Sequence, residues 1–439
     1  MNQESLDLAQ YTLERAARAG SSAAKVDVHR EQTVEVSYRD GKLDTLKSAS
    51  RRELHLSLYV DGKYSRQSTS DLRSSSLAAF ITRAVENTRL IEADPHRCLP
   101  DPRRYAKITE GELGIFDASY ADYPTDARHR YVKELETRCR EITGAQAIST
   151  SASAWDLWAE DTTVTSNGFA GARLATHFTA SVGTTLEDND RRPGDWCYEE
   201  RCLREQLPAV DTMARHAAAG AWRQMGAQKQ ATEVLPIVVD ARASATLLHA
   251  LTSALTASNI QQKRSFLIDR LHQKIGAAAL TIRDEPRLQG GAGSRWFDAD
   301  GFASEPSCPI EGGMLKQYYV DWYYSRKLGW EPTTGSPSNL VVSAGTRTAG
   351  DIMKDLGRGL LIRGFIGGNW NLTTGDFSIG IWGNYFENGE LTRAFAEMNI
   401  ADIHLDFWRK LIEVGSDVYR CWNTQTPSFA FEGVAVSGA

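Results

Sequence analysis

The segment around His249 offers the clearest test for metal-dependent chemistry in this 439-residue sequence. A zinc-peptidase helix needs a second His about one turn further along and a carboxylate that activates water. The residue directly after His249 is Ala250, and the residues four and five positions further on are Ser253 and Ala254. Neither alanine can bind a metal ion or move a proton. The spacing therefore predicts no zinc site and no adjacent catalytic base at His249.

A strand and a helix must position this histidine. Residues 235–240 form a short apolar run rich in β-branched side chains, which predicts a buried strand. Residues 241–257 contain no Gly or Pro and predict a helix. One apolar stripe of that helix holds Leu247, Leu248, Leu251 and Leu255. Because His249 lies roughly 200° round the helix from the first of these leucines, we expect it on the polar side.

The overall composition is that of an ordinary soluble protein, with 24% charged residues, 41% apolar residues and a formal net charge of -6. This balance gives no general attraction to nucleic acid or to acidic membranes. No two of the six cysteines form a CxxC pair, and no apolar run is long enough to cross a membrane. The N-terminus is polar, without the apolar core of a signal peptide. We therefore expect a reduced, cytoplasmic protein with no nucleic-acid or membrane partner.

The first half of the chain alternates helical and strand patterns. Helical periodicity covers residues 4–19, 70–91, 126–142 and 203–228, with Ser70 and Thr125 as predicted N-caps. Strand patterns cover residues 25–38, 54–58 and 147–187. Two-residue hairpin turns are indicated at Asp40-Gly41, Asp61-Gly62 and Asn167-Gly168. Together these elements predict a domain of helices and a meandering sheet over residues 1–231.

The second half is richer in strand and glycine. Strands are predicted at residues 339–344, 360–365 and 429–436, and a helix at residues 348–356. A further helix is predicted at residues 401–414, with Ile403, Phe407 and Leu411 facing inward. The aromatic run at residues 314–327 indicates either a core helix or a peptide-facing surface. The predicted fold class is α+β with two domains, residues 1–231 and residues 232–439.

One block near the C-terminus carries a family resemblance. Thr374-Gly375-Asp376-Phe377-Ser378, followed by Gly383 and by Glu387-Asn388-Gly389-Glu390, resembles the C-terminal core of the TldD/PmbA metallopeptidase family. Weaker similarity lies in Gly312-Gly313-Met314-Leu315, in Ser325-Arg326-Lys327-Leu328-Gly329 and in the final Phe431–Gly438 stretch. The resemblance extends over nearly the whole chain, including the N-terminal helix and its hairpins.

The resemblance implies one of two kinds of subunit. The TldD kind carries HExxxH on a helix and a C-terminal Cys, and is a zinc metallopeptidase; the TldE (PmbA) kind lacks the motif and partners the first. Here the corresponding positions keep His249 but hold Ala250 for the Glu and Ala254 for the second His. Near the third ligand the chain has Gly415-Ser416-Asp417, and Cys421 comes too late to be assigned as a ligand. The resemblance therefore implies a non-catalytic, TldE-like subunit.

Such a subunit would hold no cofactor of its own, and zinc is expected in the partner. The implied partner is a TldD-like HExxxH subunit in a heterodimer, with a homodimer as the alternative. The implied substrate is an unfolded or extended peptide, which could bind by adding to a sheet edge. In that setting Gly375, Asp376, Phe377 and Ser378 are either a wall of the substrate chamber or a tight turn. We favour the turn, because turn chemistry alone explains these residue types.

Other functions remain open at this stage. An autonomous peptidase or hydrolase could use Asp376, Ser378 and a histidine such as His404, although nothing in their spacing supports a catalytic triad. A non-enzymatic peptide-binding protein, or the gyrase-associated regulator that PmbA names suggest, is the other alternative. The acidic balance and the lack of a basic stripe argue against direct DNA binding.

Overall fold

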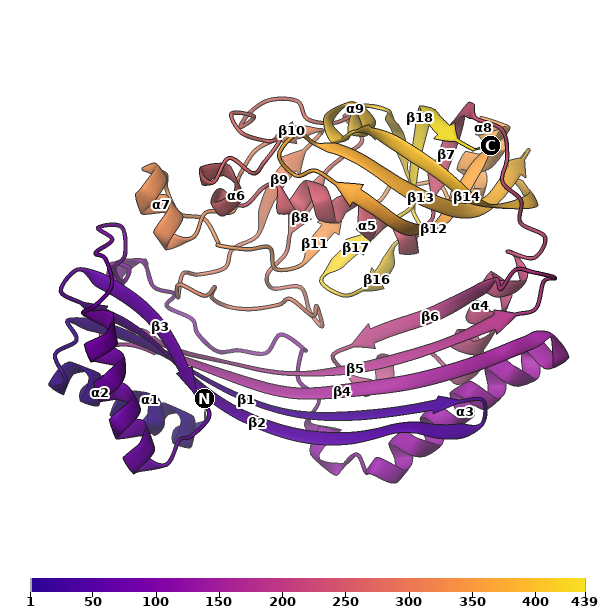
Figure 1. The fold of residues 1–439 in the computed structure, drawn as a ribbon. Coiled ribbons are helices and arrows are strands. Elements are labelled where there is room, and N and C mark those ends of the chain that lie inside the picture. Colours follow the sequence, from indigo (N-terminus) through magenta and orange to yellow (C-terminus); the bar gives the residue numbers. More distant parts are fainter. Residues whose placement is uncertain (1, 439) are drawn as a thin grey trace.

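The computed structural model describes residues 2–438, and the backbone alone of Cys421. Its first half is a long, curved antiparallel sheet in the order β3-β2-β1-β4-β5-β6 (Figure 1). The strands are β1 (Ala23–Arg39), β2 (Lys42–Val60), β3 (Lys63–Thr69), β4 (Ala147–Thr165), β5 (Ala170–Leu186) and β6 (Gly194–Arg201). Positive φ values at Asp40, Gly41, Asp61 and Gly62 confirm the two predicted Asp-Gly turns, which require them.

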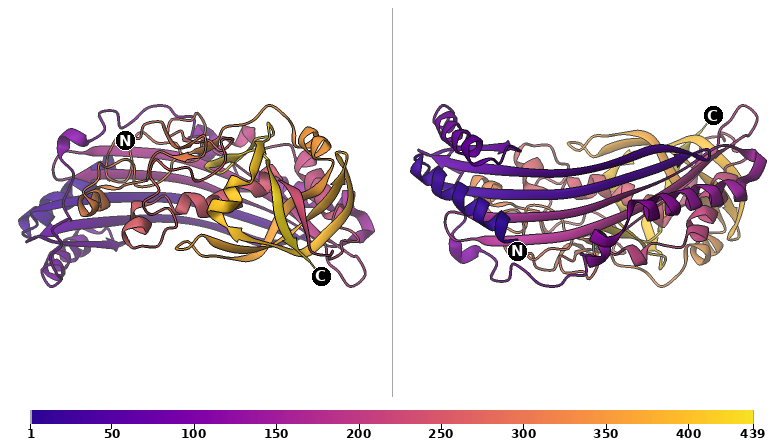
Figure 2. Two further views of the ribbon diagram at one scale, coloured as in Figure 1. Left: turned by 90° about the horizontal axis from the view of Figure 1, so that it is seen from above. Right: turned by 90° about the horizontal axis from the view of Figure 1, so that it is seen from below.

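Four helices cover the outer face of this sheet (Figure 2, right). They are α1 (Gln3–Arg18), α2 (Ser74–Thr88), α3 (Thr125–Thr143) and α4 (Val210–Trp222), and short 3-10 turns lie at Pro102–Arg104, Ala118–Asp122, Gly144–Gln146 and Arg204–Gln206. Alternate side chains such as Val26, Leu54 and Leu56 are fully buried beneath α1 and α2. The other face of the sheet faces the second half of the chain (Figure 1) and carries polar side chains such as Asp27, His29 and Glu160.

Three helix predictions in this half were wrong at their ends. Thr125, the predicted N-cap of the helix over residues 126–142, is the first residue of α3, and Pro124 is its N-cap. The helix expected from Ser70 begins at Ser74, and Arg73 rather than Ser70 is its N-cap. The helix expected over residues 203–228 is confined to α4, because Pro208 cannot continue a helix and the chain before it forms only a 3-10 turn. The chain then passes through residues 223–232 into the second half, and the domain division at residues 231 and 232 stays a prediction.

The second half contains two more six-stranded sheets, in the orders β14-β13-β12-β7-β18-β15 and β10-β9-β8-β11-β17-β16. The first is built from β7 (Glu233–Val239), β12 (Arg358–Trp370), β13 (Asp376–Glu387), β14 (Glu390–Ile403), β15 (Leu411–Val414) and β18 (Phe429–Ser437). The second is built from β8 (Ile282–Asp284), β9 (Ser307–Glu311), β10 (Met314–Leu315), β11 (Leu340–Val342), β16 (Tyr419–Cys421) and β17 (Thr424–Thr426). With the first half, these sheets confirm the α+β class.

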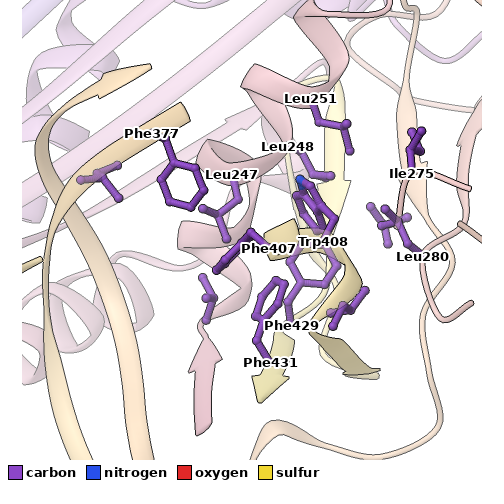
Figure 3. Close-up of a cluster of buried hydrophobic side chains, with 14 of the residues drawn as sticks. Leu247, Leu248, Leu251, Ile275, Leu280, Phe377, Phe407, Trp408, Phe429 and Phe431 are labelled. Carbon is purple, nitrogen blue, oxygen red and sulfur yellow. The ribbon is translucent and has the colours of Figure 1, made fainter. Parts of the chain in front are cut away.

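Five helices accompany these sheets: α5 (Ala241–Ser253), α6 (Ala257–Gln261), α7 (Trp322–Leu328), α8 (Ala349–Leu356) and α9 (His404–Arg409). The α5 leucines pack against the aromatic side chains of α9 and β18, among them Phe407, Trp408 and Phe431 (Figure 3). All of these side chains expose 1% of their surface or less. This cluster is the core that fixes α5 in the second half.

The helix predicted over residues 401–414 was wrong. In the structure β14 continues to Ile403, α9 is six residues long, and β15 begins at Leu411. Pairing of Asp376 with Ile403 extends the β13–β14 ladder through the start of the predicted helix, so tertiary hydrogen bonding overrides local propensity. Phe407 and Leu411 are buried as expected, whereas Ile403 is 41% exposed.

The two halves meet through both apolar and polar contacts, with Phe169 against Phe297 among the apolar ones. The hydroxyl of Tyr419 donates to the carbonyl of Tyr198 at 2.6 Å. The guanidinium of Arg242 donates to Glu199 at 3.0 Å, and the Trp322 indole donates to the Cys98 carbonyl at 3.0 Å. Within residues 2–438, no helix is long and apolar enough to cross a membrane.

Candidate functional site

Helix α5 directs His249 toward the junction between the two halves. Asp240 caps the helix, because its carboxylate accepts the Arg242 backbone N–H at 3.0 Å. The leucine stripe is buried, as predicted, and His249 is exposed on the opposite side of the helix. Sequence reasoning therefore placed this histidine correctly.

The two alanines of the zinc-motif positions lie in different surroundings. Ala250 is 7% exposed and lines a shallow pocket beside His249, whereas Ala254 is fully buried in the core just beyond the end of α5. Only His249 offers a ligand atom among these three positions. In the part of the chain that the structure describes, no group of three or more His, Cys, Asp or Glu side chains is placed to hold a metal ion. This donor set does not fit a catalytic zinc ion.

His249 lies on the wall of a cleft of about 600 Å³ between the two halves. One wall is α5, a second is β12, and a third is the edge of the first sheet at β6. Aromatic side chains make up much of the lining: Trp196, Tyr198, Trp370, Trp382, Tyr419 and Trp422. Tyr198 and Trp422 stack across the junction with ring centroids 5.1 Å apart. A concave site that combines aromatic walls with convergent polar groups is typical of a binding site.

Charged side chains from both halves converge in this cleft. Arg242 is paired with Glu199, whereas Arg363 forms no hydrogen bond or ion pair within the described chain. Its Nε is buried and unbonded. Burial lowers the pKa of Arg363 and raises that of Asp195. Burial, assisted by Arg242 and Arg363, lowers the pKa of His216 to about 4, so this histidine is neutral at pH 7.

The strand β12 offers a free edge along the cleft. Strand β7 pairs with β12 only at residues 360–362, whereas β13 pairs with it along its length. In the described chain, the β7 side of residues 363–370 therefore has no strand beside it, and Arg363, Phe365 and Trp370 line the cleft there. Such an edge can accept an extended peptide as an added strand.

The Gly375–Ser378 block forms a turn at the start of β13. Gly375 has a φ of 85°, and its N–H donates to the Asn371 carbonyl at 2.7 Å. The hydroxyl of Thr374 donates to the carboxylate of Asp376, and the Asn399 amide donates to Ser378 at 2.6 Å. None of the four residues lines the cleft. This geometry favours the turn over the chamber wall.

The structure does not assemble a triad from Asp376, Ser378 and His404. Phe377 packs on His404 with ring centroids 5.0 Å apart, and alternation along β13 turns Asp376 and Ser378 to the other face. The ring of His404 also stacks on Phe266, and both of its nitrogens are buried without a hydrogen-bond partner. Burial lowers the pKa of His404 to about 4.

Sequence reasoning missed most of the cleft. Arg363 gave no signal, because its direction depends on an irregularity in strand pairing that only the folded sheet reveals. Trp196 and Trp422 are separated by more than half the chain and meet at one cleft only after the halves dock. The aromatic run at residues 314–327 divides between two environments, with Tyr318 and Tyr319 in the core and Trp322 at the junction.

Comparison with known proteins identifies the family of this chain. The family model described as "PmbA/TldA metallopeptidase C-terminal domain" matches residues 232–438, and "PmbA/TldA metallopeptidase domain 1" matches residues 24–88. A Bacteroides thetaiotaomicron crystal structure, described as a proposed modulator of DNA gyrase, has 34% sequence identity and a TM-score of 0.96, and covers the whole of both chains. The chain belongs to the PmbA/TldD metallopeptidase family.

Two further relatives agree with this assignment. Metalloprotease PmbA of Escherichia coli O157:H7 is 25% identical over 441 residues, which is 99% of this chain and 96% of that protein. The crystal structure of TldE from Thermococcus kodakarensis has a TM-score of 0.86 at 17% identity, and covers 98% of this chain and 100% of that one. At that identity the likeness shows a shared fold.

Proposed function

We propose that this chain is a non-catalytic subunit of a TldD/TldE-type heteromeric zinc metallopeptidase that cleaves unfolded or extended peptides. The observation that carries the proposal is the helix α5, which keeps His249 but has Ala250 and Ala254 where the family's active subunits have a base and a second ligand. With Ala254 in the core, the helix has no room for a ligand there without repacking. Zinc would then belong to a TldD-like HExxxH partner.

The cleft supports a role in holding substrate. Its aromatic lining suits apolar side chains of a peptide, and the open edge of β12 offers main-chain hydrogen bonds. In the assembled peptidase this chain would hold and orient the peptide while the partner supplies the chemistry. A homodimer that binds peptides without cleaving them is the alternative version of this proposal.

We place this activity in the cytoplasm, since the described cysteines Cys98, Cys139, Cys197, Cys202 and Cys308 are free thiols. Free thiols persist in a reducing compartment. The description of the Bacteroides relative as a gyrase modulator suggests the second candidate, a regulator of gyrase. With a net charge of -6, such a regulator would act through protein contact rather than through DNA.

The test compares the purified chain alone with the chain mixed with an HExxxH-bearing subunit from the same cell. Zinc content and cleavage of an unfolded, fluorescently quenched peptide are measured in both samples. The proposal expects a metal-free, inert chain and a mixture that cleaves more than the partner alone. Stoichiometric zinc together with cleavage by the lone chain would overturn it, and so would a partner whose activity is unchanged on mixing.

A further inference from the structure

We propose that Arg363 forms a subsite in the cleft for a carboxylate of the bound peptide. Arginine is almost never buried unless it is paired, because its guanidinium carries a permanent charge and five N–H donors. Arg363 is half-buried on the cleft wall with its Nε fully buried, and within residues 2–438 no hydrogen bond or ion pair satisfies it. An anion supplied by a ligand is the partner this side chain lacks.

A β-bulge aims Arg363 into the cleft. Ile362 pairs with Gly383 and Gly364 pairs with Trp382, so Arg363 is the extra residue of β12 between two adjacent pairs. A Cβ on Gly383 would lie 1.9 Å from the carbonyl oxygen of Leu361, so only glycine fits opposite the bulge. Bulges of this kind commonly re-aim a side chain beside a functional site.

The carboxylates nearest to Arg363 form their hydrogen bonds or ion pairs with other groups. Asp240 caps α5, and Asp195 accepts its neighbour's N–H at 2.8 Å while its other oxygen packs against Gly220 of α4. Glu199 lies between Arg242 and Arg201, at 3.0 and 2.9 Å. None of these carboxylates forms an ion pair with Arg363 in the described chain. Within residues 2–438 the Nε donor of Arg363 therefore stays buried without a hydrogen-bond partner, although the charges of Asp240 and Asp195 act on this guanidinium.

The surroundings indicate a peptide carboxylate rather than another anion. The free edge of β12 begins at Arg363, so a peptide added to that edge would bring one end, or one side chain, to the guanidinium. Aromatic walls on either side suit peptide side chains. A carboxylate matches the guanidinium fork with two parallel hydrogen bonds. This inference rests on the proposed function only in taking the ligand to be an extended peptide.

Fluorescence polarisation with the full-length chain tests the subsite. Four labelled peptides share one unstructured apolar core. Two have a free C-terminal carboxylate and two are amidated there, and in each pair one peptide has Asp and the other Asn near the C-terminus. We expect at least one carboxylate to tighten binding by about 10- to 100-fold over the doubly neutral peptide. The four peptides separate a terminal carboxylate from a side-chain carboxylate as the source.

The decisive variant is Arg363→Gln, with Arg223→Gln as its matched control. Arg223 is an exposed arginine close to the cleft but outside its lining, so its loss removes the same charge without removing the subsite. We expect Arg363→Gln to bind all four peptides equally and Arg223→Gln to keep the wild-type preference. Arg363→Lys, which keeps the charge but not the fork, should retain a reduced preference and guards against misfolding of the glutamine variant.

Three outcomes would overturn the subsite: no peptide binds, the carboxylate and neutral peptides bind equally to the wild type, or the two glutamine variants behave alike. The binding assay needs no catalytic partner. If carboxylate preference is present but the partner's activity is unaffected by mixing, the proposed function fails and the subsite stands. If mixing restores cleavage but Arg363→Gln keeps the preference, the subsite alone fails.

Discussion

Acid should destabilise this protein through His404, and the size of the effect follows from its burial. The imidazole is 2% exposed, stacks on Phe266 and Trp370, and has no hydrogen-bond partner at either nitrogen. Its pKa in the folded chain is about 4, against an ordinary 6.5. The unfolded chain therefore binds the proton more tightly, and stability that is present above pH 6.5 is lost as the pH falls toward 4.

These two pKa values give a loss of about 2 kcal/mol between pH 7.5 and pH 5 from this one site. The substitution His404→Phe keeps an aromatic ring against the same neighbours and removes the titration. We expect the variant to be at least as stable as the wild type at pH 7.5, because two unsatisfied nitrogens are gone. Between pH 7.5 and pH 5 it should lose about 2 kcal/mol less than the wild type does.

Urea unfolding followed by tryptophan fluorescence at the two pH values measures the difference. His249→Gln serves as the control, since it also removes one histidine but from an exposed position on α5. His216, whose pKa is also lowered to about 4, is present in all three proteins and cancels in the comparison. Equal losses of stability in the wild type and in His404→Phe would refute the reasoning.

Three further substitutions probe the turn, the degenerate helix and the aromatic wall. Gly375→Ala places a Cβ at a φ of 85° and 3.1 Å from Phe266, and should cost about 1 to 3 kcal/mol in urea unfolding; no loss would contradict the strained turn. Ala254→His puts an imidazole into a fully buried site, and should lower stability by about 1 to 3 kcal/mol without recruiting zinc, as metal analysis would show. Trp422→Ala removes the stack on Tyr198, and should weaken peptide binding several-fold in polarisation with little change in melting temperature; unchanged binding would exclude this wall from the site.

Local signals were sufficient where the chain's neighbours in sequence are also its neighbours in space. The Asp-Gly turns and the exposure of His249 opposite the α5 leucines were predicted because hairpins and helices depend on short-range spacing. The segment over residues 401–414 was predicted as one long helix because its apolar spacing fits a helical period. Its real structure is decided by strands that are distant in the sequence, because residues 401–403 pair with β13 and β15 pairs with β18.

The cleft exists only because the two halves dock. Arg363 and Arg242 come from the second half, whereas Asp195, Trp196 and His216 come from the first. The junction beside them is held by the Tyr419 hydroxyl on the Tyr198 carbonyl and by the Arg242–Glu199 pair.

Glu199 consequently has two tasks: it joins the halves, and it neutralises Arg242 so that Arg363 is the arginine left without a partner. Removing the charge of Glu199 with Glu199→Gln would take the shared carboxylate from Arg242 and Arg201, beside the already unpaired Arg363. We expect this variant to change its preference for carboxylate over neutral peptides and, at the same time, to loosen the junction between the halves. The peptide affinity and the melting temperature should therefore both change in the same variant. Binding that changes while the melting temperature does not would separate the two tasks.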